Sequence, residues 1–359
     1  MQRALLRFEN AVKSDATREQ YNYSLNRFLK YAKIPRAEEL LQLKDDFLQR
    51  LLEDYLFHLK KRVGPNSIPP HFAALELFLA INDKNLNFKK IRKMFPARLK
   101  KTGGKAYTTA QVRQMLEVTT NHRGKAIIHL FASTGCRVGA IPSLHLKHMQ
   151  EIEDCKAVTF YEGEAEEYVG FLTPEASRVV DAYLEKRKRD GEIMTRESPL
   201  IRRSYQFGAS KARPVSKEAI QAFVAQVLRK AGIERARQGN RYEIQLDHGF
   251  RKRFNTIIKN NNGGSIHLKE KLMAHSTRLL PLDGAYHDPG VMALFDEFKR
   301  HIPNLIIDDA ERSRLEVAAK AKRISELEAE MKVHESMVRW FRRYRDAHPE
   351  EFKEIESQS

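Results

Sequence analysis

The sequence predicts a mainly α-helical protein of two domains with one small β-hairpin and a long C-terminal helix. Apolar residues recur at helical spacing through most of the 359 residues. Two strand-like runs, 155–161 and 168–172, flank the acidic stretch E-G-E-A-E-E, which predicts a hairpin. A basic stretch with Pro and two Gly, at 96–107, lies between two helical regions and predicts a linker.

Composition predicts a globular protein with a polyanionic partner. The net charge is +17, and the hydrophobic content of 42% is ordinary for a folded domain. The charge favours nucleic acid over a membrane surface, although solvated basic faces are the simpler interpretation. No apolar run approaches a membrane span, and the first residues lack the apolar core of a secretory signal. Only two cysteines, Cys136 and Cys155, are present, so we expect no disulfide framework, no metal and a cytoplasmic location.

The N-terminal domain, residues 1–95, is predicted to be entirely helical. Its first helix follows an entry segment and has a plausible N-cap at Thr17. Further helices are expected at about 44–61 and 70–82, with a short one near 89–95. The basic linker follows at 96–107.

The second domain, residues 108–307, begins with a helix capped near Thr109 and contains a buried helix over 126–132. After the hairpin, helical patterns recur from Pro174 and at 216–231 and 248–261, which makes this domain mixed α+β.

Residues 308–359 begin with a long charged helix, over 308–346. Its seam runs Ile324, Leu327, Met331, His334, Val338 and Phe341. This spacing predicts an amphipathic helix that packs on its own or a neighbouring subunit and is a possible oligomerisation element.

The segment from Asp247 to Tyr286 gathers the residues suited to a phosphate. His248 and Arg251 are three residues apart and share a helix face. His275 follows an apolar step, and Tyr286 lies in a loop beside Gly and Pro. Cationic donors bind phosphate oxygens, and a phenol is able to attack phosphorus.

Each of these residues has a simpler interpretation when it is taken alone. An arginine after Thr-Gly, such as Arg137, is usually a surface residue at a helix start, and a lone H-x-x-R is usually a solvated face. A histidine beside Ala and Ser is more often a satisfied core residue, and a loop tyrosine often packs. Their joint occurrence on a strongly basic chain favours a functional site.

The motifs S-T-G-C-R-V-G-A-I around Arg137, D-H-G-F-R-K-R-F around His248 and Arg251, and L-M-A-H-S-T before Tyr286 occur in a characteristic order. In these motifs the chain resembles the tyrosine recombinases, the lambda-integrase-type site-specific DNA recombinases, and archaeal integrases in particular. The resemblance covers about 107–300 and extends weakly to the N-terminal helices. It implies an N-terminal helical core-binding domain and an α+β tyrosine recombinase catalytic domain.

The resemblance also implies a chemistry. Tyr286 would attack a DNA phosphodiester and leave a 3′-phosphotyrosine and a free 5′-hydroxyl. Arg137 and Arg251 would bind the non-bridging oxygens, His248 would transfer a proton or contact the phosphate, and His275 would hydrogen-bond the same phosphate. The covalent link conserves bond energy, so neither ATP nor metal is expected, and four protomers would exchange four strands.

Three positions depart from the family pattern. The family's general-acid lysine lies in the hairpin, where this chain has E-G-E-A-E-E; Lys156 is the nearest lysine. Either Lys156 reaches the site, or another residue substitutes, or the position was altered near Ala165 and activity is impaired. An acidic residue often follows the first arginine by three positions, where this chain has Ala140. His275 and Tyr286 are eleven residues apart, against about nine in the family.

The expected partner is double-stranded DNA, bound between the two domains by a self-assembled tetramer associated with the nucleoid. The candidate phosphate contacts are Arg92, Lys93, Arg98, Lys100, Lys101 and Lys105. Two alternatives stay open: a type IB topoisomerase-like DNA relaxase, and a DNA-binding protein with a decayed catalytic site.

Overall fold

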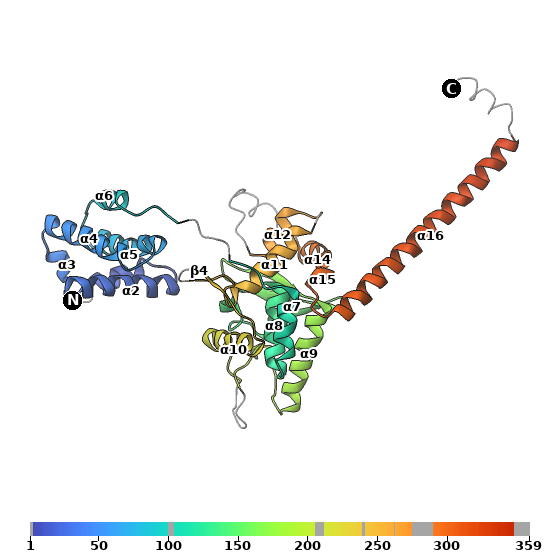
Figure 1. Cartoon of the computed structure of the whole chain (residues 1–359), viewed down its shortest axis with the longest axis horizontal. Coiled ribbons are helices and arrows are strands. Elements are labelled where there is room, and N and C mark those ends of the chain that lie inside the picture. Colours follow the sequence, from blue (N-terminus) through green and yellow to red (C-terminus); the bar gives the residue numbers. More distant parts are fainter. Residues whose placement is uncertain are drawn as a thin grey trace, which may run out of the picture. The chain divides into compact units, whose positions relative to one another are not determined.

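The first unit, Met1–Gly103, is helical (Figure 1). The apolar faces of its helices meet in one core. The computed structural model describes residues 3–99, 104–204, 212–238, 241–261, 263–274 and 290–347. The elements of this unit are α1 Arg3–Asn10, α2 Asp15–Ala32, α3 Glu39–Gln42, α4 Asp45–Lys60, the 3₁₀ turn η1 Pro65–Ser67, α5 Ile68–Ile81 and α6 Phe88–Lys93.

Helix α4 illustrates how the apolar pattern builds this core. Leu48, Leu52, Leu56 and Leu59 recur every three or four residues and are all buried. The predicted N-cap of α2 at Thr17 is wrong. The helix begins at Asp15, because Ser14 takes the extended backbone of an N-cap and its carbonyl accepts the first helical hydrogen bond. Helix α1 was not predicted.

The second unit, Gly104–Ser359, contains the three-stranded sheet and its surrounding helices. Its helices are α7 Thr109–Glu117, α8 His122–Thr134, α9 Pro174–Arg189, α10 Lys217–Lys230, α11 His248–Asn260, α12 Ile266–Leu272, α14 Val291–Lys299, α15 Ile302–Leu305 and α16 Asp309–Ala347, with the 3₁₀ turns η2 Val138–Ala140 and η3 Leu146–His148. The strands are β1 Met149–Ile152, β2 Cys155–Phe160, β3 Tyr168–Leu172, β4 Arg237–Gln238 and β5 Arg241–Tyr242.

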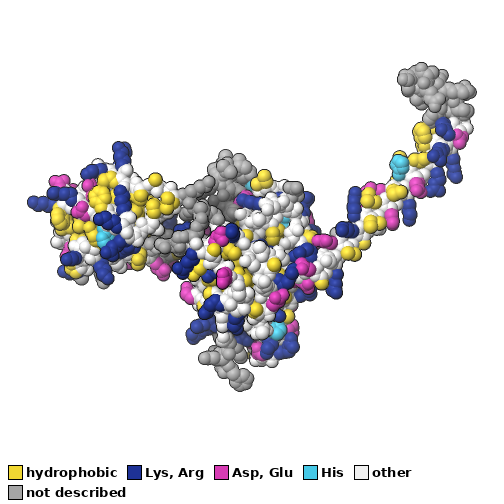
Figure 2. All heavy atoms as spheres, in the orientation of Figure 1, with side chains coloured by type: hydrophobic (Ala, Val, Ile, Leu, Met, Phe, Trp, Pro, Cys, Tyr) yellow, Lys and Arg dark blue, Asp and Glu magenta, His cyan; other side chains and the backbone are white. Residues whose placement is uncertain are grey.

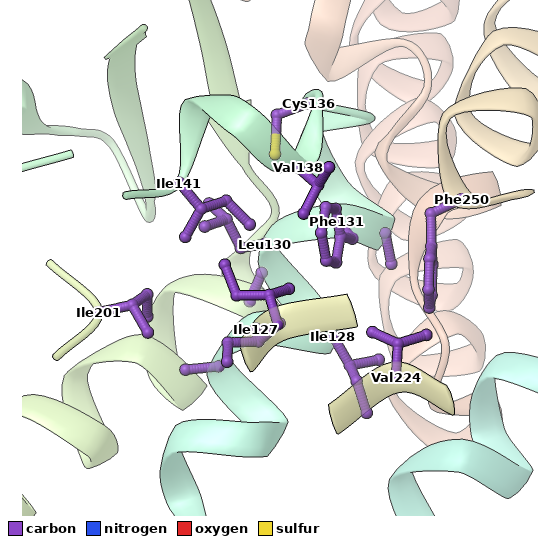
Figure 3. Packing of buried hydrophobic residues seen from close by; sticks show 14 of the residues in the cluster. Ile127, Ile128, Leu130, Phe131, Cys136, Val138, Ile141, Ile201, Val224 and Phe250 are labelled. Carbon is purple, nitrogen blue, oxygen red and sulfur yellow. The ribbon is translucent and has the colours of Figure 1, made fainter. Parts of the chain in front are cut away.

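Helix α8 is the centre of this unit (Figure 3). All of its residues from Ala126 to Thr134 are buried, which confirms the buried helix predicted over 126–132. The Phe131 ring stacks on Phe250 of α11, with ring centroids 5.4 Å apart and planes inclined by 15°. This contact holds the C-terminal end of α8 next to the start of α11, which are the two places where the sequence predicts site residues.

The predicted hairpin is present, and a third strand extends it. Strands β2 and β3 pair antiparallel with Phe160 opposite Tyr168, and β1 pairs with β2 through Met149 and Val158. The sequence did not predict β1, because M-Q-E-I has exposed polar residues in its middle and little apolar patterning. Helices α12, α14 and α15 cover one face of this sheet with a second apolar cluster.

In the described residues, helix α16 contacts the rest of the second unit through its first turns only. Arg113 forms an ion pair of 2.6 Å with Asp309, and Arg178 pairs with Glu311. Farther along, exposed apolar side chains alternate with charged ones, as Figure 2 shows for this helix. Within the described residues, no helix is long and apolar enough to span a membrane.

Candidate active site

The turn after α8 is built around Gly135 and presents Arg137. Gly135 has a left-handed backbone with φ 59°, and its N–H donates to the carbonyl of Phe131 at 2.9 Å. A Cβ atom at this position would lie 2.8 Å from the Cβ of Phe254 on α11, so only glycine fits without a shift. Arg137 follows two residues later as the exposed N-cap residue of η2.

The Arg251 guanidinium is buried and links two helix ends. Its Nη1 donates to the carbonyl of Gly135 at 2.9 Å, and its Nη2 donates to the carbonyl of Met273. Helix ends leave such carbonyls without partners inside the helix, and Arg251 supplies donors for both. The side chain therefore fixes the ends of α8 and α12 against α11.

Arg137 and Arg251 form a site of concentrated positive charge. Burial lowers the pKa of Arg251, and the positive charge of Arg137 lowers it further. The hydrogen-bond partners of Arg251 are carbonyl oxygens, and neither guanidinium appears among the ion pairs of the described residues. Two cations that act on each other and have no carboxylate partner among the described residues favour the binding of an anion, and planar guanidinium groups suit a phosphate.

His248 begins α11, three residues before Arg251, and is exposed. Desolvation by the surrounding protein lowers the pKa of His248, as do the charges of Lys252 and Arg251. The neutral imidazole is therefore favoured at neutral pH, and it is able to accept a proton.

Strand β3 runs alongside the C-terminal end of α8. The Ser133 hydroxyl donates to the carbonyl of Phe171 at 3.0 Å. The neighbours of these two residues, Thr134 on α8 and Gly170 on β3, are also close, since a Cβ on Gly170 would lie 3.5 Å from the Cβ of Thr134. The next inward residue of β3 is Tyr168, so the start of this strand lies beside the turn that carries Arg137.

Two tyrosines at the base of the hairpin loop share this environment. Tyr168 stacks on Phe160 with centroids 4.8 Å apart, and its ring centroid lies 6.4 Å from that of Tyr161. The charge of Arg137 acts on both phenols, and both phenols act on Arg251. The sequence interpretation missed these two residues, although a tyrosine at each end of an acidic loop is a visible signal.

The structure does not bring Lys156 to these residues. Its buried ammonium group pairs with Glu151 and lies 3.0 Å from Asp181 on α9. Lys156 is opposite Leu172, at the end of β2 remote from the hairpin loop. At about 3.3 Å per residue it lies roughly 16 Å along the strand from Tyr161. The site that we propose therefore does not include Lys156.

The predicted residues His275 and Tyr286 lie outside the described residues. The described segment before them ends with Met273, whose carbonyl accepts from Arg251, and Ala274.

The predicted DNA contacts are basic residues near the end of the first unit and the start of the second. Arg92 pairs with Glu76 on α5, and Lys105 forms an ion pair of 2.8 Å with Glu243. Lys93 and Arg98 are exposed, and Lys100 and Lys101 lie outside the described residues.

Comparisons with known proteins identify the family of this part of the chain. The model of the phage integrase family matches residues 105–278. Tyrosine recombinase XerC of Lactobacillus delbrueckii subsp. bulgaricus is 24% identical over 185 residues, which are 50% of this chain and 55% of the relative. Tyrosine recombinase XerC of Lactobacillus leichmannii is 24% identical over 188 residues, again 50% and 55%. The chain thus spans about half the length of the curated relatives it matches. The likeness to archaeal integrases stays a prediction.

Two solved structures share the fold. A lambda integrase dimer bound to a COC′ core site matches with a TM-score of 0.51 and 13% identity, over 80% of this chain and 77% of the other. The XerH site-specific recombinase bound to difH, in a pre-cleavage complex, matches with a TM-score of 0.50 and 13% identity, over 78% of each chain. Residues 105–278 thus carry a phage integrase family domain, and the chain is similar in sequence to tyrosine recombinases.

Proposed function

We propose that this chain is a site-specific DNA recombinase that cleaves and rejoins DNA strands through a 3′-phosphotyrosine intermediate. The observation that carries the proposal is the placement of Arg251. Its buried guanidinium is fixed by the carbonyls of Gly135 and Met273, next to the exposed Arg137 and three residues after His248. A rigid cation beside an accessible one is suited to stabilise charge that builds up on phosphate oxygens.

In the proposed reaction, the Tyr286 phenol attacks the scissile phosphorus while Arg137 and Arg251 hold the non-bridging oxygens. His248 takes the phenol proton, since its lowered pKa keeps the imidazole neutral. His275 hydrogen-bonds the same phosphate. The phosphotyrosine retains the energy of the phosphodiester, so the reaction as proposed uses neither ATP nor a metal. The 5′-hydroxyl of a second strand then reverses the step.

The proposed partner is double-stranded DNA held by both units. The first unit and the residues 96–107 would contribute phosphate contacts, which release counterions and fix the register of the protein on the duplex. Four protomers would assemble on two DNA sites, in the cytoplasm and at the nucleoid. The match to recombinases and integrases supports strand exchange over relaxation by a type IB topoisomerase.

A DNA-binding protein with a decayed catalytic site is the second candidate, because the described hairpin residues 161–167 contain no lysine. Covalent trapping separates the two candidates. A preferred site is first selected from a randomised duplex library with the full chain. The selected duplex is then nicked just beyond the cleavage point, so that the released fragment diffuses away and the adduct persists.

We expect a denaturing gel to show a protein–DNA adduct, and peptide mapping to locate the DNA on Tyr286. Tyr286→Phe should abolish the adduct and leave the DNA affinity nearly unchanged, since one hydroxyl adds little to many phosphate contacts. An adduct that persists in Tyr286→Phe would contradict the nucleophile assignment. DNA binding without any adduct would favour the decayed site.

A further inference from the structure

Strand cleavage by a phenol needs a proton donor as well as an acceptor. When the P–O5′ bond breaks, the electron pair stays on the 5′-oxygen. An alkoxide is a far stronger base than the attacking phenolate, so the reaction is slow unless a positioned acid protonates the leaving oxygen. This inference rests on the proposed function and concerns which residue supplies that proton.

The described residues of the site offer few acids. Arginine holds its protons too strongly to serve, which sets aside Arg137 and Arg251. His248 favours its neutral form, which suits it to accept a proton. Lys156 lies at the other end of β2 and is paired with Glu151 and Asp181. Besides His248 and Arg251, the charge of Arg137 acts on the phenols of Tyr161 and Tyr168.

Of these two phenols, only Tyr161 is accessible. The Tyr168 residue is 8% exposed, and its hydroxyl is buried without a hydrogen-bond partner among the described residues. Its ring stacks on Phe160, so the oxygen cannot reach a bound DNA strand without unpacking. Tyr161 is half-buried, at the edge where the hairpin loop begins.

The backbone places Tyr161 where β2 ends and the loop turns away. Its φ of 56° lies in the left-handed region, which a bulky aromatic residue rarely occupies. Its carbonyl accepts from the N–H of Glu164 at 2.9 Å, and the N–H of Gly163 donates to the Glu167 carboxylate at 2.6 Å. The loop is thus closed on itself, and it holds Tyr161 in a conformation that an unconstrained chain would avoid.

The charges around the Tyr161 phenol suit a general acid, which is protonated before the reaction and loses its proton during it. Burial raises its pKa, as do Glu166 and Glu164 in the same loop, so the phenol is protonated at neutral pH. The positive charge of Arg137 acts in the other direction and would stabilise the phenolate once the proton has left.

We propose that Tyr161 is the general acid of strand cleavage and protonates the leaving 5′-oxygen. The Tyr286 oxygen forms the new bond to phosphorus, and its proton goes to His248. The P–O5′ bond breaks, and the 5′-oxygen takes the proton of Tyr161, which becomes a phenolate beside Arg137. Religation returns both protons by the reverse path.

Lys147 is the competing donor. Its ammonium group lies 3.7 Å from Glu162 in the hairpin loop and 3.3 Å from Glu197. These two carboxylates hold the ammonium group of Lys147. A test of Tyr161 therefore needs Lys147 as a parallel variant.

A leaving group that needs no acid provides the test. In the selected duplex, sulfur replaces the 5′-bridging oxygen at the scissile phosphate. A thiol has a pKa of about 8.5, so a thiolate leaves without a proton. The rate of covalent adduct formation is measured on the oxygen and sulfur duplexes for the wild type and for Tyr161→Phe, Tyr168→Phe and Lys147→Met.

We expect the Tyr161→Phe variant to cleave the oxygen duplex about 100-fold more slowly than the wild type, or slower still. The same variant should cleave the sulfur duplex at nearly the wild-type rate. Tyr168→Phe and Lys147→Met should match the wild type on both. Equal slowing on both duplexes would reduce Tyr161 to a positioning residue, and an unimpaired Tyr161→Phe would remove the role. A loss that sulfur rescues in Lys147→Met or Tyr168→Phe would assign the acid there. If the wild type forms no adduct on either duplex, the proposed function itself fails.

Discussion

The Nη1 atom of Arg251 donates a hydrogen bond of 2.9 Å to the carbonyl oxygen of Gly135, which lies 116 residues earlier in the chain. The same glycine gives α8 its left-handed end, and Arg137 follows two residues later. One glycine thus sets the positions of both guanidinium groups. The backbone at Gly135, the packing of Phe254 and the geometry of the proposed phosphate site are therefore coupled.

Gly135→Ala should destabilise the protein more than the same change at Gly191. Both glycines have positive φ, and a left-handed alanine costs about 1 kcal/mol. At Gly191 nothing lies within 4 Å of the added Cβ, whereas at Gly135 it would lie 2.8 Å from the Cβ of Phe254. We expect a loss of about 1 kcal/mol at Gly191 and about 3 kcal/mol at Gly135, measured by urea unfolding. Equal losses would show that the contact with Phe254 relaxes freely.

Arg251→Met and Arg253→Met should separate catalysis from stability. Arg253 is also buried, and its Nη2 donates to the carbonyl of Leu305 at 3.1 Å, away from the proposed site. Each change leaves buried carbonyls unpartnered and should cost about 2 kcal/mol in urea unfolding. Covalent adduct formation, measured well below either unfolding transition, should fall by about 1,000-fold only in Arg251→Met.

Arg137→Ala completes this comparison, because Arg137 is exposed and its loss should leave the urea midpoint nearly unchanged. A comparable loss of cleavage in Arg253→Met would mean that general destabilisation, and not phosphate binding, explains the effect of Arg251→Met.

Sequence patterns predicted the long elements well. The helices expected at 44–61 and 308–346 occur as Asp45–Lys60 and Asp309–Ala347, because many periodic residues define each of them. Strand β1 escaped prediction, since its four residues gain their structure from pairing with β2 and not from their own pattern.

Part of the candidate site was also predictable, and part was not. The spacing of His248 and Arg251 placed them on one helix face, but it did not indicate that Arg251 is buried against carbonyls from two other helices. Lys156 was chosen by its place in the sequence, yet the strand register puts it at the wrong end of β2. Tyr161 was missed because its position depends on a left-handed backbone that no sequence pattern indicated.

The buried His129 should make folding sensitive to acid. Burial lowers its pKa to about 4, and the nearby charges of Lys125 and Arg253 act in the same direction. The folded state therefore keeps the imidazole neutral, while the unfolded chain binds a proton below about pH 6.5. Stability should fall as the pH drops from about 6.5 to about 4, by at most about 3 kcal/mol from this group.

Urea unfolding across this pH range should show a shallower slope for His129→Phe than for the wild type. His122→Gln, at the exposed start of the same helix, serves as the control and should keep the wild-type slope. An unchanged slope in His129→Phe would mean that His129 does not contribute to the acid sensitivity.

The exposed seam of α16 should support assembly on DNA and not cleavage. Ile324, Leu327 and Met331 are 56%, 42% and 62% exposed and follow the three-and-four spacing of a coiled coil. Truncation after Ile307 would also remove Asp309 and the anchoring ion pair with Arg113, so a substitution in the full chain is the sharper test.

We expect Leu327→Glu with Met331→Glu to weaken the proposed tetramer on two-site DNA at least tenfold, as measured by sedimentation. Cleavage of the single-site suicide duplex should stay at the wild-type rate. The control is Ala329→Glu with Val333→Glu, which makes the same change in charge on the other face of the helix and should leave assembly intact. Equal weakening by both pairs would point to helix charge, and unchanged assembly in both would remove the seam from the assembly.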